Sequence, residues 1–151
     1  MQPVTIKLAP KPERKRVETD IVHDIMRALS RIRGVRVARN NVGVLEDIRG
    51  IPVTYGLGDG SPDLVGIITL GGINTFLPEL AELEPWPLTI AIEVKQPKRY
   101  PSPKQRTWHA AAKRRGLRVG VARSKEDATD HVEAIRGNIR AWLRRAGGLL
   151  A

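Results

Sequence analysis

The sequence predicts an α/β domain in which a mixed central sheet is flanked by helices, and two observations support this fold class. Apolar residues recur at helical spacing over about 13–33 and 125–145, whereas strand-like apolar runs lie mainly between these segments. The resulting order of helix, strand, weak strand, strand, strand, helix, strand and helix is typical of an α/β domain. With 151 residues, 41% of them hydrophobic, the chain is long enough for one domain with a substantial core. We expect that domain at 13–146, after a flexible basic arm at 1–12 and before a tail at 147–151.

The chain is strongly basic, with 26 Lys and Arg against 16 Asp and Glu and a formal net charge of +10. This surplus favours a polyanionic partner, most commonly nucleic acid, although a basic protein with only non-specific affinity would show it too. A membrane partner has no support, because no long apolar segment or lipidation signal is present. The absence of cysteine excludes disulfides, thiol catalysis and Cys-based zinc sites. Because no secretory segment is seen either, we expect a cytoplasmic protein.

The first helix is predicted over 13–33, where one face is apolar. That face consists of Val17, Ile21, Ile25, Leu29 and Ile32. Gly34 ends the helix as a C-terminal cap, and the alternating segment 35–41 forms the following strand. Glu18 lies beside the apolar face, so it is either a solvated helix charge, which the spacing alone favours, or a carboxylate that faces a site.

The segment 43–60 is predicted to be mostly loop, with a short strand at 51–55 and three glycines that allow tight turns before Asp63. No Gly-Lys-Ser/Thr follows, and the glycine spacing does not match a dinucleotide fingerprint, so we expect no nucleotide cofactor. A second well-defined strand is predicted at 64–70. The acidic, proline-containing stretch 73–88 then joins two antiparallel strands, as a short helix or an irregular excursion.

The centre of the chain is the apolar strand 90–95, in which period-two alternation places Glu93 and Lys95 on the same face. Opposite charges at the end of a buried strand are costly unless they are paired or used. If this strand pairs with the one that follows Asp63, two carboxylates and an ammonium converge. Such a cluster suits a divalent metal and a water that attacks a phosphate. The alternative is a turn at Asp63 and a simple ion pair between Glu93 and Lys95.

A basic loop follows at 96–101, and a helix begins after Ser102, which is a good N-cap with a proline behind it. Gln105 and Trp108 share one face of this helix. Spacing alone is consistent with a surface amide at Gln105 and with core packing, in preference to base stacking, at Trp108. The candidate nucleic-acid contacts on the loop and helix are Lys98, Arg99, Lys104, Arg106, Lys113 and Arg114.

A strand at 117–122 and a last helix over 125–145 complete the domain. The apolar face of this helix is predicted to contain Ala128, Val132, Ile135, Ile139 and Trp142. A second face carries an arginine row that is either solvated or follows phosphates, and it consists of Arg136, Arg140 and Arg144. The histidines have no partner at metal-ligand spacing and are interpreted as structural or surface residues; they are His23, His109 and His131.

Five short motifs occur in order along the chain. They are Asn40-Asn41-Val42-Gly43, the run from Tyr55 to Gly66 that contains Ser61-Pro62-Asp63, Ile92-Glu93-Val94-Lys95, Ser102-Pro103-x-Gln105-x-x-Trp108 and Val121-Ala122-Arg123-Ser124. Linked motifs in the right order are much more specific than any one alone. Together they resemble the VRR-NUC branch of the PD-(D/E)xK nuclease superfamily, from roughly Val17 to the start of the last helix. The resemblance implies a restriction-endonuclease-like core, in which a helix, a three-stranded antiparallel meander, a helix and a further strand follow one another.

The resemblance also implies roles for the matching residues. Asp63 and Glu93 would bind a metal together with the backbone carbonyl of Val94. Lys95 would position or polarise the attacking water and stabilise developing charge. These oxygen ligands suit Mg²⁺, and we expect Mn²⁺ to substitute for it.

Two further residues match positions near the metal in this family. Glu18 corresponds to the first-helix glutamate that is often found there, which makes it a candidate catalytic residue and metal ligand. Gln105 corresponds to the glutamine that the helix after the E-x-K strand places near the metal or the water.

The expected function is therefore that of a metal-dependent endonuclease that hydrolyses phosphodiester bonds in DNA. The chain also resembles small stand-alone members of this branch. That likeness implies a phage or mobile-element protein, and a homodimer that acts on branched DNA such as four-way junctions. We accordingly expect a homodimer in the cytoplasm of a bacterium or of a phage-infected host cell. One alternative is a sequence-specific restriction-type nuclease, for which 151 residues leave little room. The other is a non-catalytic DNA-binding module on the same fold, against which the intact carboxylates argue.

Overall fold

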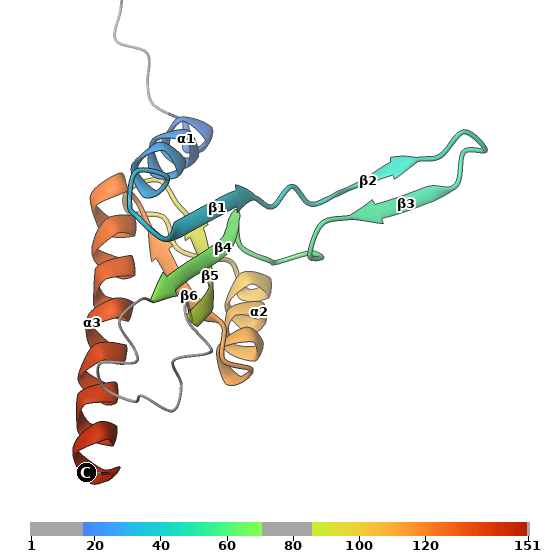
Figure 1. Cartoon of the computed structure of the whole chain (residues 1–151). Helices are drawn as coiled ribbons and strands as arrows, with labels where there is room; N and C mark the ends of the chain where they lie inside the picture. Colours follow the sequence, from blue (N-terminus) through green and yellow to red (C-terminus); the bar gives the residue numbers. More distant parts are fainter. Residues whose placement is uncertain (1–16, 71–85, 151) are drawn as a thin grey trace, which may run out of the picture.

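The computed structural model of the chain describes residues 17–70 and 86–150. Within these residues, four strands form a central sheet, two strands form a separate hairpin, and three helices complete the fold (Figure 1). The predicted arm at 1–12 lies outside the described residues, as does most of the predicted excursion at 73–88. None of the described helices is long and apolar enough to cross a membrane.

The central sheet has the strand order β1–β4–β5–β6. Its strands are β1 (Val35–Arg39), β4 (Leu64–Leu70), β5 (Trp86–Val94) and β6 (Arg118–Ala122). Antiparallel pairing joins β1 to β4 and β4 to β5, whereas β5 and β6 are parallel. The sheet is therefore mixed, as predicted, and the antiparallel pairing expected on either side of the excursion is confirmed.

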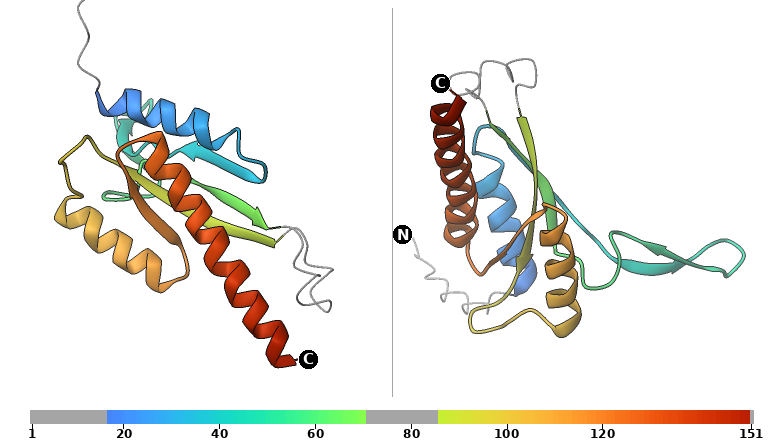
Figure 2. Two further views of the ribbon diagram at one scale, coloured as in Figure 1. Left: turned by 90° about the vertical axis from the view of Figure 1, so that its left-hand side faces the viewer. Right: turned by 90° about the horizontal axis from the view of Figure 1, so that it is seen from below.

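Helices cover both faces of the sheet. Helices α1 (Glu18–Leu29) and α3 (Lys125–Leu150) lie together on one face, and α2 (Pro103–Arg114) lies on the other face against β6 (Figure 2). Parallel strands need a crossover between them, and α2 provides it for β5 and β6. Its predicted N-cap is confirmed: the Ser102 hydroxyl accepts from the backbone N–H of Gln105 at 3.2 Å. The last helix extends beyond its predicted end at 145.

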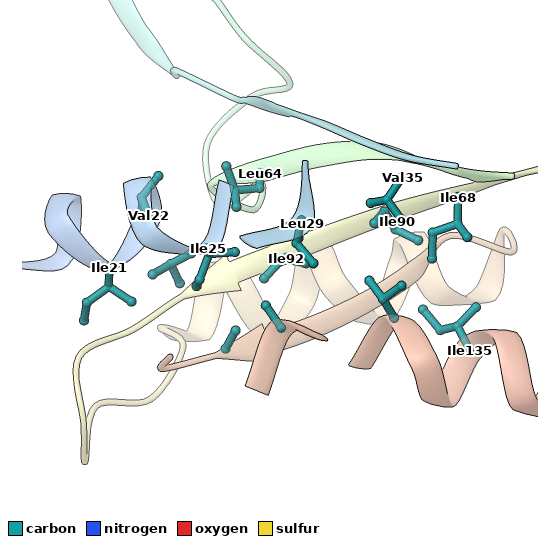
Figure 3. Packing of buried hydrophobic residues seen from close by; sticks show 14 residues of the cluster. Ile21, Val22, Ile25, Leu29, Val35, Leu64, Ile68, Ile90, Ile92 and Ile135 are labelled. Atoms are coloured by element: carbon teal, nitrogen blue, oxygen red, sulfur yellow. The ribbon is translucent and has the colours of Figure 1, made fainter. Parts of the chain in front are cut away.

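The hydrophobic core fills the layer between the sheet and helices α1 and α3. Ile25 and Leu29 of α1 and Ile90 and Ile92 of β5 are all at most 1% exposed, and they meet in this layer (Figure 3). The apolar stripe of the helix and the alternating apolar residues of the strand thus share one core. Burial of such a side chain stabilises the fold by about 1.5–3 kcal/mol, so β5 is held firmly in place.

The apolar face of the last helix ends differently from the prediction: Trp142 lines a hollow with Ile135 and Ile139 but is not buried. Leu143 is buried there, whereas Trp142 is 52% exposed. Steps of three and four residues both continue a helical stripe, so spacing from Ile139 does not separate the two positions. Within the arginine row, Arg136 donates to the carbonyl oxygen of Arg33 at 2.5 Å and thereby connects α3 to the chain after α1.

Strands β2 (Gly43–Glu46) and β3 (Pro52–Tyr55) pair as a hairpin that projects away from the sheet (Figure 1). The short strand at 51–55 was predicted, but the expectation of loop at 43–46 is wrong. A period-two signal arises when one face of a strand is buried and the other is not. All residues of this hairpin strand pair except Gly43 are exposed, so that signal is absent.

Candidate active site

Strand β5 brings the predicted carboxylate and ammonium to its C-terminal end. Ile90 and Ile92 point into the core with α1 and α3, so alternation directs Glu93 to the opposite face, which α2 covers. The Glu93 side chain has no exposed surface. Lys95 follows directly after the strand, and its backbone N–H still donates to the carbonyl of Ala122 at 3.0 Å. A deeply buried acid is therefore held on a rigid element.

Strand pairing brings Asp63 to the same place. Leu64 is opposite Ile92 in the antiparallel register of β4 and β5, so Asp63 lies beside the end of β5. Its Oδ2 atom accepts a hydrogen bond from the backbone N–H of Val94 at 2.7 Å. The chain thus places two carboxylates side by side at the point where β4 begins and β5 ends.

Lys95 lies between two acids. Its Nζ atom is 2.5 Å from Oε1 of Glu93 and 3.5 Å from Oε1 of Glu18. Glu18 is the first residue of α1 and is partly exposed. The first helix therefore contacts the site through one ion pair, between Glu18 and the ammonium of Lys95.

Helix α2 closes the other side of Glu93. The side-chain amide of Gln105 donates to Oε1 of Glu93, and Oε1 of Gln105 itself accepts from the backbone N–H of Ser102 at 2.8 Å. One turn later, Nε2 of the buried His109 lies 3.5 Å from Oε2 of Glu93. Sequence reasoning missed His109 as a site residue. The signal was its four-residue step from Gln105, which places both side chains on one face.

The electrostatics of the site centre on Glu93. Burial raises the pKa of Glu93 from 4.5 to about 7; the hydrogen bond from Lys95 works against this increase, and the negative charge of Asp63 adds to it. Burial lowers the pKa of Lys95, but the hydrogen bond and charge of Glu93 outweigh it, so the net shift is upward. Burial, together with the cations Lys113 and Lys95, lowers the pKa of His109, which favours its neutral form. The ammonium of Lys95 therefore stays charged beside Glu93, an acid that titrates near neutrality.

One carboxylate oxygen of Glu93 has no hydrogen-bond partner among the described residues. Oε2 of Glu93 is buried and accepts no hydrogen bond from any described residue, although an unsatisfied buried acceptor costs about 1–3 kcal/mol. Within the described part of the chain, no three acidic or histidine side chains form a group that could hold a metal ion. Mg²⁺, however, keeps several waters and binds proteins through one or two carboxylates plus substrate phosphates. The oxygens of Asp63 and Glu93 fit such an ion.

The turn that carries Asp63 is held by Asn40, which follows β1. Its backbone N–H donates to the carbonyl of Asp63 at 2.8 Å, and its amide nitrogen donates to Oγ of Ser61 and to the carbonyl of Pro62. Gly60 has φ +85°, and a Cβ there would lie 3.0 Å from the Lys104 backbone. The turn is therefore packed directly on the start of α2.

For the nuclease activity that the sequence resemblance implies, we expect Asn40→Ala to lower the cleavage rate about 10-fold or more while leaving DNA affinity near its wild-type value. The substitution removes both hydrogen bonds that the Asn40 side chain donates to the turn, so Asp63 is held less firmly, and the free energy of unfolding should fall by about 1–3 kcal/mol. Single-turnover cleavage and thermal unfolding measure the two effects. Asn41→Ala is the matched control, because Asn41 is the exposed neighbour; equal losses in both variants would contradict this role of Asn40.

The six basic residues predicted to contact nucleic acid are all exposed; they are Lys98, Arg99, Lys104, Arg106, Lys113 and Arg114. Lys104 pairs with Asp59 at 2.5 Å, which links α2 to the turn before Asp63. Arg123 lies over the ring of Tyr100 and donates to the carbonyl of Arg99 at 2.9 Å. These contacts order the basic loop beside the end of β5.

A family comparison decides how this site is to be understood. The model of the VRR-NUC domain matches residues 25–126, which is more than half of the chain. The chain belongs to the VRR-NUC domain family. The predicted family is thereby confirmed, and the mixed sheet with its three helices agrees with the restriction-endonuclease-like α/β fold. Comparisons of the chain with curated proteins and with solved structures found no significant match.

Membership in the VRR-NUC family implies a nuclease-type function with DNA as the substrate class. The matched range contains Asp63, Glu93, Lys95 and Gln105, whereas Glu18 precedes it. Four of the side chains predicted from the sequence therefore lie together both in the structure and inside the family match.

Proposed function

We propose that this VRR-NUC protein is a metal-dependent endodeoxyribonuclease that hydrolyses phosphodiester bonds in branched DNA such as four-way junctions. The observation that carries the proposal is the buried carboxylate of Glu93. One of its oxygens is bound by Lys95 and Gln105, and the other accepts no hydrogen bond from the described residues. A protein that only binds DNA gains nothing from carboxylates placed close to the bound polyanion.

A divalent cation, Mg²⁺ or in its place Mn²⁺, would be held by Asp63, Glu93 and the carbonyl oxygen of Val94. When bound, the cation would lower the pKa of a water molecule and neutralise charge on the phosphate oxygens. It would also provide the partner that Oε2 of Glu93 lacks among the described residues.

The side chains around the acids have separate tasks. Lys95 offsets the negative charge of the carboxylates where the phosphate must approach, and its ammonium stabilises charge that develops in the transition state. Gln105 donates a hydrogen bond to Oε1 of Glu93 and so fixes the orientation of the carboxylate. Oε2 then remains available for a ligand. Glu18 pairs with Lys95 and limits how far that ammonium moves.

A symmetric DNA junction calls for two coordinated cuts, and one small domain has one such site. We therefore include a homodimer in the proposal. The basic loop and α2, with their exposed Lys and Arg side chains, would contact the DNA backbone beside the site. A sequence-specific restriction-type activity is the second candidate, and substrate preference separates the two.

The proposal is tested by incubating the protein with labelled four-way junction, flap, single-stranded and linear duplex DNA, each with Mg²⁺, with Mn²⁺ or with EDTA. We expect cleavage with either metal, no cleavage in EDTA, and a preference for the junction. Asp63→Ala should abolish cleavage of every substrate, because it removes one of the two proposed carboxylate ligands. Exposed Asp130→Ala on α3 is the matched control and should cut normally.

Three outcomes would change the proposal. Cleavage that persists in EDTA would refute the metal requirement. Cleavage of one linear duplex sequence in preference to all branched substrates would favour the restriction-type alternative. DNA binding without cleavage of any substrate would favour the non-catalytic module.

A further inference from the structure

The β2–β3 hairpin is the one part of the described chain that stands apart from the body. It covers residues 43–55 and projects away from the sheet on the side that carries α2 (Figures 1 and 2). An isolated two-stranded hairpin is marginally stable in water and needs a packing surface. Within the described residues the hairpin strands have none, because seven of their eight residues are exposed.

The hairpin has one clearly apolar face. Residues directly opposite each other in an antiparallel pair share a face, and Leu45 is opposite Val53. Tyr55, two residues from Val53, is on the same face and lies over Gly43. Leu45, Val53 and Tyr55 are 64%, 50% and 40% exposed. The opposite face is mixed: Val44, which is 60% exposed, and Pro52 are apolar, whereas Glu46 and Thr54 are polar.

The tip of the hairpin is already ordered by its own hydrogen bonds. Oδ1 of Asp47 accepts from the backbone N–H groups of Arg49 and Ile51 at 2.8 and 2.9 Å. Gly50, at φ +76°, donates its N–H to the carbonyl of Asp47. A preformed hairpin loses little conformational entropy when it docks on a partner.

The charges of the hairpin argue against DNA as that partner. Its charged residues are Glu46, Asp47 and Arg49, so it carries a formal net charge of −1 in a chain whose net charge is +10. Arg49 is already paired with Asp47 at 2.8 Å. A surface that follows phosphates would carry free cations. Because Arg49 is paired with Asp47, the remaining charge of the hairpin is the carboxylate of Glu46, and the basic body of a second copy of this chain complements it in sign.

The body offers a matching surface on the same side of the sheet. On β1 and β4, the face opposite α1 and α3 is not covered by α2, which packs on β6. A shallow apolar hollow there is lined by Arg36, Ala38, Leu57, Val65, Ile67 and Leu117. Ile67 is 41% exposed. Because the hollow and the hairpin are on one side of the sheet, a single two-fold axis on that side can bring each hairpin to the hollow of the other copy.

We infer that two copies of the chain exchange their hairpins, with Leu45, Val53 and Tyr55 of each packing on the β1–β4 hollow of the other. This inference names the contact surface of the homodimer in the proposed function. The base of the hairpin adjoins Asn40, which holds the Asp63 turn. Docking of the hairpin therefore steadies the segment that carries a site carboxylate.

The test compares two neighbouring residues of similar shape on opposite hairpin faces. The full chain is examined by sedimentation equilibrium, and the wild type should have twice the monomer mass of 16.7 kDa. Val53→Asp and Ile67→Lys should each raise the dimer dissociation constant by at least about 10-fold, because each places a charge in an apolar contact, and a lysine in place of Ile67 lies opposite Arg36 and finds no partner there. Thr54→Asp adds the same charge as Val53→Asp on the opposite face and should leave the dimer intact. Thermal unfolding verifies that each variant is folded.

Because the chain has no cysteine, disulfide cross-linking between introduced cysteines gives a second measurement. This measurement does not require a substitution that destabilises the dimer. Val53→Cys and Ile67→Cys variants are mixed and oxidised, and we expect a disulfide-linked heterodimer. Thr54→Cys mixed with Ile67→Cys should give much less.

A monomeric wild type at 100 µM, equal effects of Val53→Asp and Thr54→Asp, or no excess cross-linking at Val53 would each overturn the inference. Unchanged mass with weakened DNA binding in Val53→Asp would overturn it in favour of a DNA contact. Metal-dependent cleavage by a monomer would leave the nuclease proposal standing while this inference fails.

Discussion

Replacing Glu93 by Gln is expected to reduce DNA cleavage by at least about 10²-fold while DNA affinity stays the same or increases. Gln preserves the volume of the buried side chain but removes the negative charge that the proposed metal site requires. It also removes a buried negative charge close to where a polyanion must bind, so DNA affinity is not expected to fall. Cleavage of junction DNA at saturating protein, together with a binding titration in EDTA, measures both effects.

Glu133→Gln supplies the control for charge, because Glu133 is exposed on α3 and the substitution changes the net charge equally. We expect it to cut at the wild-type rate. If Glu93→Gln still cleaved at the wild-type rate, or lost binding and cleavage together, Glu93 would not have the catalytic role proposed for it.

Replacing Lys95 by Met is expected to lower cleavage on the order of 10²-fold and to destabilise the metal-free protein on the order of 2 kcal/mol at pH 8. The ammonium of Lys95 is 2.5 Å from Oε1 of Glu93, and the Glu93 side chain is fully buried. Removal of the cation leaves a buried carboxylate without its charged partner. Urea unfolding in EDTA measures the stability, and single-turnover cleavage measures the activity.

The stability effect has a defined pH dependence. The pKa of Glu93 is raised from 4.5 to about 7 in the folded protein. The folded state therefore retains a proton that the unfolded state loses between these values, so the contribution of Glu93 to stability falls as pH rises from about 4.5 through 7. Without Lys95 the pKa of Glu93 moves higher still, so Lys95→Met should lose more stability at pH 8 than at pH 5.

A double substitution provides the control for this mechanism. Glu93→Gln removes the buried charge, so Lys95→Met should cost much less stability in that background than in the wild type, and the difference is the coupling energy of the pair. Additive losses, or a destabilisation by Lys95→Met that is the same at pH 5 and pH 8, would show that the loss comes from packing and not from the charge of Glu93.

Much of the fold follows from local physics that the sequence displays. The period-two run that ends in Glu93, the apolar strand after Asp63 and the capping residue Ser102 each depend on neighbours within a few positions. Such patterns are readable from one sequence, and they predicted the mixed sheet and the helix order. Linked motifs then identified the VRR-NUC family, which the family match confirms.

Other features depend on contacts between residues that are distant in the sequence. Sequence spacing associated Gln105 with Trp108, but packing of α2 against β5 brings His109, one turn from Gln105, to Glu93. Trp142 and Leu143 both continue the stripe of α3, but only Leu143 is buried, and spacing along the helix does not separate the two positions. The hairpin at 43–55 lacked a period-two signal because its strands have almost no buried face in the chain by itself.

The sequence by itself therefore predicted most of the elements and their order, because propensity, capping and alternation are local, and its linked motifs singled out Asp63, Glu93 and Lys95 as the candidate site. Only the tertiary structure decided which oxygen of Glu93 is left without a hydrogen bond, which side chains surround it, and that the hairpin projects from the body. These properties depend on the relative placement of β4, β5 and α2, since burial and hydrogen bonding are set by neighbours that the sequence order does not place together.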